Sequence, residues 1–200
     1  MEHWIGKSVP RLDGREKVTG QAVYTVDVEL PNMLHAAVLR STRPHARIVE
    51  IDCTAARAVP GVRAVVTGKD FPYTHGGMIK DQPFIAIDRV RYVGEVVAAV
   101  AAETEAIAQE AVSRIQVRYE DLPAVFDPKE ALAAGAPIIH ERLAEYPRSP
   151  LYENLPGTNV CTIRTFTRGD VAAGFAEADE VYDDEFYIHA VAHTPMETHA

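Results

Sequence analysis

Apolar and polar residues alternate over much of the first 125 residues, as is typical of strands with one face against a core. Residues 90–103 differ because they are apolar on both faces, which indicates a central, covered strand. Turn residues such as Pro31, Asn32 and Gly61 separate the runs. The pattern predicts strands at 23–28, 33–41, 46–53, 62–68, 90–103 and 116–125, with a short helical turn at 54–61.

A helix is predicted between the last two of these strands. Thr104 is a suitable N-cap residue, and one apolar face follows it at helical spacing over 104–116. Strand, helix and strand within about forty residues make a β-α-β unit. The sequence leaves open whether its two strands pair in parallel.

The stretch FDPKEALAAG has the clearest local signature in the chain. Asp127 is the predicted N-cap, Pro128 occupies the first helical position, Glu130 completes a capping box and Gly135 ends the helix. The following residues carry four prolines up to position 159 and little periodicity, which is typical of a linker between domains.

The remaining residues predict a second α+β region. We expect a strand at 158–169, a short helix at 170–178 capped by Asp170, and one or two strands at 180–197. The predicted organisation is an N-terminal arm, a first α+β domain, a helix with a proline-rich linker, and the incomplete start of another domain. The boundaries are 1–17, 18–126, 127–159 and 160–200.

The net charge of −9 is distributed unevenly along the chain. The segment from Gly169 onward contains eight acids and no lysine or arginine, whereas the residues before it are nearly balanced. The sequence contains no basic patch with interleaved aromatic residues, so a nucleic-acid partner is not expected. No signal peptide is recognisable and the longest apolar run, VVAAVAA, is too short for a membrane span, so we expect a cytoplasmic protein without a membrane partner.

The cysteines and most of the histidines give no metal-binding motif. Cys53 and Cys161 lie far apart without C-x-x-C spacing, and free thiols are the favoured interpretation. The remaining single histidines are expected to be hydrogen-bonding residues rather than catalysts. They are His35, His75 and His140.

The end of the chain offers a weak candidate metal site. His189 and His193 are four residues apart, but the apolar residues around them favour a strand, along which four residues span roughly 13 Å. One ion cannot bridge that distance. Glu197 and His199 would share a strand face, and ordinary strand-face residues are the favoured interpretation over a metal site.

Two internal positions also stand out. His45 follows Pro44 and lies between Arg43 and Arg47, a cluster suited to an anion or a neighbouring subunit, although a polar turn between strands is the favoured interpretation. Glu95 has apolar neighbours and therefore needs a donor if it is buried. It marks a buried network or a domain contact, or lies on a bulge facing water.

Four segments, taken in order, resemble the start of the large, molybdenum-binding subunit of the xanthine dehydrogenase/aldehyde oxidase family. They are RLDGREKVTGQAVYTVDVELPNMLHAAVLRSTRPHARIVEID (11–52), PGVRAVVTGKDFP (60–72), RYVGEVVAAVAAETEAIAQEAVSRIQVRYEDLPAV (91–125) and GDVAAGFAEADEVYDDEFYIHAVAHTPMETHA (169–200). The resemblance implies an α+β fold with an α/β hammerhead domain at 18–126, followed by the truncated start of a molybdopterin-binding domain.

The resemblance also implies a function for the larger enzyme. Such enzymes hydroxylate an N-heterocyclic, purine or aldehyde carbon with water, using a molybdenum–molybdopterin cofactor in the large subunit and [2Fe-2S] and FAD on partner subunits. The family's Gly-rich loop and catalytic glutamate are expected downstream of Ala200. We therefore assign no catalytic, cofactor-binding or metal-binding residue to this chain, and no cofactor to the chain alone. The alternative is a stand-alone hammerhead module for binding or assembly, without catalysis.

Overall fold

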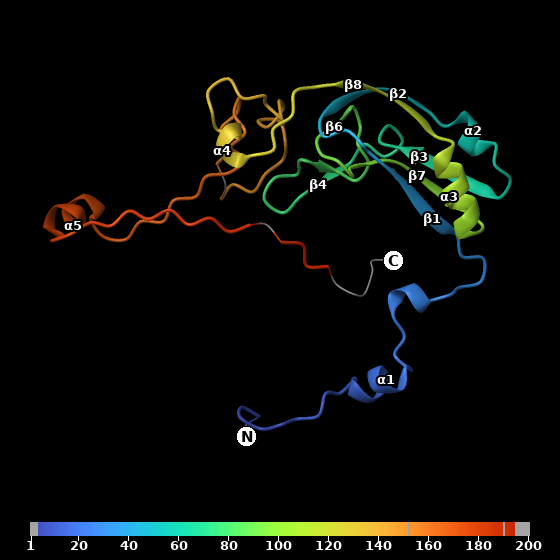
Figure 1. Cartoon of the computed structure of the whole chain (residues 1–200), viewed down its shortest axis with the longest axis horizontal. Helices are drawn as coiled ribbons and strands as arrows, with labels where there is room; N and C mark the ends of the chain where they lie inside the picture. The colour runs from blue at the N-terminus through green and yellow to red at the C-terminus, as the bar shows by residue number, and fades with distance from the viewer. Residues whose placement is uncertain (1–3, 152, 190, 195–200) are drawn as a thin grey trace. The chain divides into compact units, whose positions relative to one another are not determined.

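The computed structural model describes residues 4–151, 153–189 and 191–194. The chain divides into two compact units. The larger unit consists of residues 34–177, and the smaller one combines 1–33 with 178–200. Figure 1 labels the helices and strands of the chain.

Antiparallel strands form the framework of the larger unit. The strands are β1 (His35–Arg40), β2 (Ala46–Asp52), β3 (Val62–Thr67), β4 (Thr74–His75), β5 (Gln82–Pro83), β6 (Arg89–Val90), β7 (Val96–Ala102) and β8 (Gln116–Asp121). They make three sheets with the orders β1-β7-β3, β6-β2-β8 and β4-β5. The predicted strands at 33–41, 46–53, 62–68 and 116–125 are thereby confirmed, with shorter bounds.

β7 is the central strand of the first sheet, as its two-sided apolar pattern predicts. Val100 is opposite Ala37 of β1 on one side and Val65 of β3 on the other. Both Val100 and its neighbour Ala98 are buried. Of the predicted strand 90–103, Val90 instead belongs to β6 in the second sheet, and residues 91–95 form no strand.

Helix α3 (Glu105–Ser113) packs on β7 and β1 through small side chains, and lies beside these strands in Figure 1. Ala108 and Ala111 are fully buried, so the helix backbone approaches the sheet closely. The Thr104 hydroxyl accepts a hydrogen bond from Ile107 N at 3.3 Å, which confirms the predicted N-cap. A four-residue helix, α2 (Thr54–Arg57), contributes Ala56 to the same core.

Parallel pairing within the β-α-β unit does not occur. β7 already has β1 and β3 on its two edges, so neither edge is available to β8. β8 pairs antiparallel with β2 instead, with Tyr119 opposite Ile48. The β-α-β unit therefore connects two sheets, since β7 belongs to the first and β8 to the second. Helix α3 lies between these two strands in sequence.

The segment after β8 contains two short helices, α4 (Pro128–Ala131) and α5 (Val171–Glu177). Asp127 caps α4 through hydrogen bonds from the N–H groups of Lys129 and Glu130, and Asp170 accepts from Ala173 N at 3.0 Å, as predicted for both caps. α4 ends before Gly135, which adopts φ +83° in the following turn. The predicted strand at 158–169 is wrong, because within it only an isolated pairing of Glu153 with Ile163 forms.

The smaller unit has local structure in place of the predicted strand at 23–28. Its helix α1 (Gly14–Thr19) is followed by a 3₁₀ helix, η1 (Thr25–Asp27), which is closed by a hydrogen bond from Tyr24 N to Asp27 Oδ2 at 3.0 Å. This local side-chain bond takes the place of a strand partner.

The strands predicted at 180–197 are also absent from the described residues 180–189 and 191–194. Glu197 and His199 lie outside the described residues. No helix in the described ranges combines the length and apolar character that a membrane span requires.

Candidate functional site

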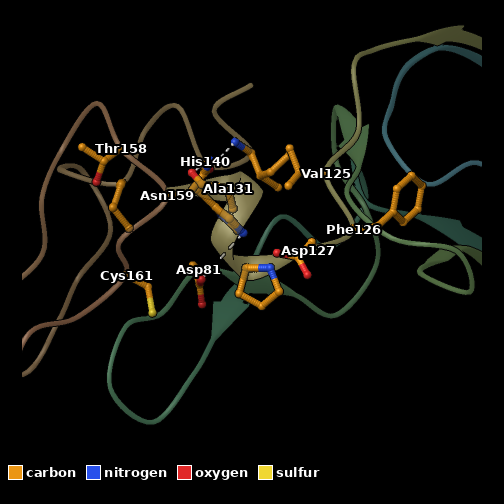
Figure 2. Close-up of a pocket in the computed structure, with 12 residues that line it drawn as sticks. Asp81, Val125, Phe126, Asp127, Ala131, His140, Thr158, Asn159 and Cys161 are labelled. Atoms are coloured by element: carbon orange, nitrogen blue, oxygen red, sulfur yellow. Dashed lines mark hydrogen bonds and ion pairs between the residues drawn. The ribbon is translucent and has the colours of Figure 1, made fainter. Parts of the chain in front are cut away.

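A cavity of about 290 Å³ lies beside α4 in the larger unit (Figure 2). Val125, Ile139 and Leu143 provide apolar wall, and Asp81 and His140 provide polar groups. The cavity collects residues from the loop before β5, from α4 and from the proline-rich connector, segments far apart in sequence. It is the strongest candidate for a binding site in this unit.

The Asn159 side chain holds the cavity together, and Figure 2 shows it beside α4. Its Oδ1 accepts from Ile139 N at 2.9 Å, while its Nδ2 donates to Ala131 O at 3.0 Å and to Pro137 O at 2.9 Å. One amide thus satisfies three backbone groups, one at the end of α4 and two in the turn that follows it, which has no regular hydrogen-bond ladder.

Asp81 enters the cavity from a tightly held loop. The residues before it are bonded to the connector, since Lys80 N donates to Pro147 O at 2.9 Å and Ser149 N donates to Met78 O at 3.1 Å. The loop turns at Gly76, where an added Cβ would lie 1.8 Å from a backbone oxygen at φ +149°. Only glycine fits this turn without displacing the backbone.

His140 lies next to Asp81, with its Nε2 3.8 Å from Asp81 Oδ2. Burial lowers the pKa of His140, and the positive charge of Arg91 acts in the same direction while the Asp81 carboxylate opposes it. The imidazole is therefore neutral near pH 7. Arg91 Nε also donates to Ile139 O at 3.2 Å, which ties the connector to the loop before β7.

Glu95 belongs to a buried network, the first of the alternatives that its apolar surroundings suggested. The residue is 4% exposed, and its Oε2 accepts from Arg91 N at 2.6 Å. Burial raises the pKa of the Glu95 carboxyl, while the backbone N–H and the charge of Arg91 oppose that rise. The water-facing alternative for Glu95 is wrong.

The contacts of His45 and its flanking arginines correspond to a structural turn. His45 is buried, with its Nδ1 2.6 Å from Pro123 O. Arg43 lies 3.6 Å from Asp121, and Arg47 lies 3.2 Å from Glu120. Both arginines therefore face carboxylates of β8, and the three side chains do not converge on an anion site.

The other candidate residues do not assemble into a metal site. The described part of the chain has no group of three or more histidine, cysteine, aspartate or glutamate side chains arranged for a metal ion. Cys53 is buried and Cys161 is exposed, and neither forms a disulfide. Burial raises the pKa of the Cys53 thiol, which disfavours the thiolate. His189 lies against the Tyr187 ring rather than beside a second imidazole.

Sequence reasoning missed three residues that shape this site. Asp81, Arg91 and Asn159 all lie in irregular stretches, where no periodicity marks a residue as inward-facing. The hydrogen bonds of Asn159 and Arg91 to Ile139 join positions 20 and 48 residues apart, and Asp81 lies near His140, which is still more distant in sequence. No local sequence signal identifies such contacts.

Comparison with known families identifies the family to which the chain belongs. Residues 19–123 match the family of the aldehyde oxidase and xanthine dehydrogenase a/b hammerhead domain, and residues 151–200 match the molybdopterin cofactor-binding domain. The chain therefore belongs to the aldehyde oxidase and xanthine dehydrogenase family of oxidoreductases, as its sequence segments suggested.

Individual relatives agree with this assignment. The chain is 42% identical to a probable xanthine dehydrogenase subunit of Bacillus subtilis (strain 168), over 94% of this chain and 24% of that protein. It is 37% identical to the nicotinate dehydrogenase large molybdopterin subunit of Eubacterium barkeri, over 98% of this chain and 43% of that protein. The chain thus spans less than half the length of these two relatives.

A solved structure shows the same fold. Quinoline 2-oxidoreductase from Pseudomonas putida 86 superimposes with a TM-score of 0.60 and 42% identity, over 66% of this chain and 18% of that one.

The cavity beside α4 does not fit a molybdopterin cofactor, which carries an anionic phosphate. Such a group requires cationic side chains or free N–H groups at a helix N-terminus. The cavity beside α4 instead presents the carboxylates of Asp81 and Asp127, and no lysine or arginine of the described chain lines it. Asp127 itself caps the N–H groups of α4. We therefore derive no chemical step through the cofactor from these residues.

Proposed function

We propose that this chain is a scaffold segment of the large subunit of a cytoplasmic molybdenum hydroxylase. The whole enzyme would hydroxylate an N-heterocyclic, purine or aldehyde carbon with oxygen from water. The matches to the hammerhead family at 19–123 and to the molybdopterin-binding family at 151–200, in that order, are the observation that carries this proposal.

The proposed organisation is a hammerhead domain at 18–126, a helix and connector at 127–159, and part of a molybdopterin-binding domain at 160–200. The hammerhead would supply a stable framework and contacts between subunits, and the molybdenum–pterin cofactor would be held by other parts of the large subunit. [2Fe-2S] clusters and FAD would be carried by partner subunits. The name of the Eubacterium barkeri relative, a large molybdopterin subunit, supports this division of roles.

Exposed apolar side chains in the segment after the connector also support a role within a larger assembly. Phe166, Phe186 and Ile188 are all exposed in the chain as described. Large apolar groups left in water indicate surfaces that pack against further polypeptide.

Purification from the native host tests the proposal. The protein that carries this chain would be affinity-tagged and isolated with its partners, its molybdenum and iron measured, and purine, nicotinate and aldehyde substrates tried with a dye as electron acceptor. We expect stoichiometric molybdenum and a product that takes its new oxygen from isotope-labelled water. A metal-free protein without this activity would refute the proposal.

A second function, a hammerhead module for binding or assembly without catalysis, is favoured by one specific observation. Residues 34–177 contain their own buried clusters, including Val65, Val100 and Ile115 in one and Val90 and Val97 in another. A unit with such a core is expected to fold without catalytic domains. Cooperative unfolding of the 200-residue chain, together with isolation of a metal-free native form that binds a protein partner, would favour this alternative.

A further inference from the structure

Two adjacent cavities of the larger unit share the side chain of Asp81. The first, beside α4, is the 290 Å³ cavity of Figure 2, and the second, of about 170 Å³, lies against the loop at Gly76 and Met78. Cys161 also lines both. Asp81 therefore stands at the junction of two small compartments, of which the first has largely apolar walls and the second has mixed polar and apolar walls.

The Asp81 carboxylate is partly buried and has one titratable partner at close range among the described residues. Its side chain is only 19% exposed, and His140 is the group of the described chain that lies within ion-pair distance, at 3.8 Å. Because burial lowers the pKa of His140, the imidazole is neutral near pH 7 and adds no positive charge beside the carboxylate. A desolvated carboxylate favours a cationic partner strongly.

Arg91 does not fill this role in the two compartments. Arg142 lines one other cavity that touches Asp81, and Arg91 lines that cavity and a further one, but neither the first compartment nor the second is lined by Arg142 or by Arg91. The Nε of Arg91 donates to Ile139 O, and the charge of Arg91 acts on Glu95 and His140. Among the described residues, no lysine or arginine lines the first or second cavity, whereas Asp81 and Asp127 both line the first.

We propose that the Asp81 compartments receive the basic side chain of a partner polypeptide, an arginine or lysine whose apolar stem lies against the cavity wall. The carboxylate would pair with the guanidinium or ammonium group, while Val125 and Ile139 contact the methylene groups. This inference is independent of the chemistry proposed for the whole enzyme.

The size of the first cavity suits a long side chain. Sites for small molecules and cofactors commonly enclose about 300–1,000 Å³. The first cavity, at about 290 Å³, falls at or below the lower end of that range. A second compartment of about 170 Å³ continues past Asp81, which leaves room for the residues that flank an inserted side chain.

Calorimetric titration of the full 200-residue chain with the peptide acetyl-Ala-Leu-Arg-Leu-Ala-amide tests this site. A matched peptide with citrulline in place of arginine keeps the shape and removes the charge. We expect the arginine peptide to bind and the citrulline peptide to bind at least about tenfold more weakly, a difference of about 1.4 kcal/mol. Equal affinity for the two peptides, or binding of neither, would overturn the proposal.

Two variants and one small probe complete the experiment. Asp81→Asn should weaken the arginine peptide about tenfold, whereas Glu50→Gln, which removes an exposed carboxylate on β2, should leave binding unchanged. Circular dichroism melting verifies that both variants are folded, and Asp81→Glu provides a folded, charged comparison if Asp81→Asn is not. If n-butylguanidinium bound as tightly as the peptide, the site would serve a free organic cation, and the polypeptide assignment would be wrong.

Discussion

Replacing Asn159 by alanine should release the turn after α4 from the connector. The wild-type amide makes hydrogen bonds to Ile139 N, Ala131 O and Pro137 O, all at 2.9–3.0 Å. A hydrogen bond of this kind contributes about 1 kcal/mol to stability. The three together correspond to about 3 kcal/mol, or about 6–12 °C in melting temperature for a chain of this size.

Asn154 provides a matched control for this estimate. Its Nδ2 makes one hydrogen bond, to Leu143 O at 3.1 Å, so Asn154→Ala should cost about 1 kcal/mol. Asn159→Asp provides a second comparison, in which the loss of stability should be larger than in Asn159→Ala. The aspartate keeps an acceptor for Ile139 N but places a carboxylate against two carbonyl oxygens, so it should be less stable than Asn159→Ala.

Urea unfolding measures the change in free energy, and amide hydrogen exchange locates it. Protection of the Ile139 amide should fall in Asn159→Ala, while protection of the Val100 amide in β7 should follow only the global stability. The reasoning fails if Asn159→Ala is no more destabilising than Asn154→Ala, or if the Ile139 amide keeps its protection.

Three further substitutions test the core, the loop and the buried carboxyl. Val100→Ala should lower the free energy of unfolding in urea by about 2–3 kcal/mol because it removes part of a buried side chain. Val66 is partly exposed, so Val66→Ala should lower the free energy of unfolding by less than about 1 kcal/mol. Gly76→Ala should lose about 2–3 kcal/mol through backbone strain, whereas Gly77→Ala, with open space around its Cβ, should be nearly neutral; similar melting temperatures would contradict this. Since the folded-state pKa of Glu95 is raised, wild-type stability should fall as pH rises through that pKa. The free energy of unfolding of Glu95→Gln, measured in urea at pH 5 and pH 8, should therefore rise relative to that of the wild type at the higher pH. A pH-independent difference between the two proteins would contradict the raised pKa.

Periodicity predicted the framework wherever an element buries one face or both. β1, β2, β3, α3 and β8 formed where alternation or helical spacing indicated them, and β7 formed within the two-sided apolar run. The predictions for 23–28 and, within the described residues 180–189 and 191–194, for 180–197 were wrong for a different reason. Alternation alone does not supply a partner strand, and local bonds such as the one from Tyr24 N to Asp27 satisfy the backbone instead.

The site was less predictable than the framework. Glu95 could be identified because a carboxyl among apolar neighbours needs a donor, and Arg91 N supplies it. Asp81 and Asn159 could not, because they lie in irregular segments and their importance comes from contacts with distant residues. Pairing direction was also beyond local sequence, since it depended on both edges of β7 being occupied.

Most buried polar side chains of the larger unit are directed at backbone groups. Glu95 accepts from a loop N–H, the ring of His45 lies 2.6 Å from a carbonyl beyond β8, and Asn159 binds three backbone groups at the end of α4 and in the turn after it. Side chains used in this way fix the positions of loops and are not available to a substrate, which supports the proposed scaffold role. Asp81 is different, because in the described chain its mostly buried carboxylate faces cavities and a neutral imidazole rather than a backbone donor. We therefore infer that the Asp81 carboxylate is the place at which this scaffold is best suited to recognise another molecule.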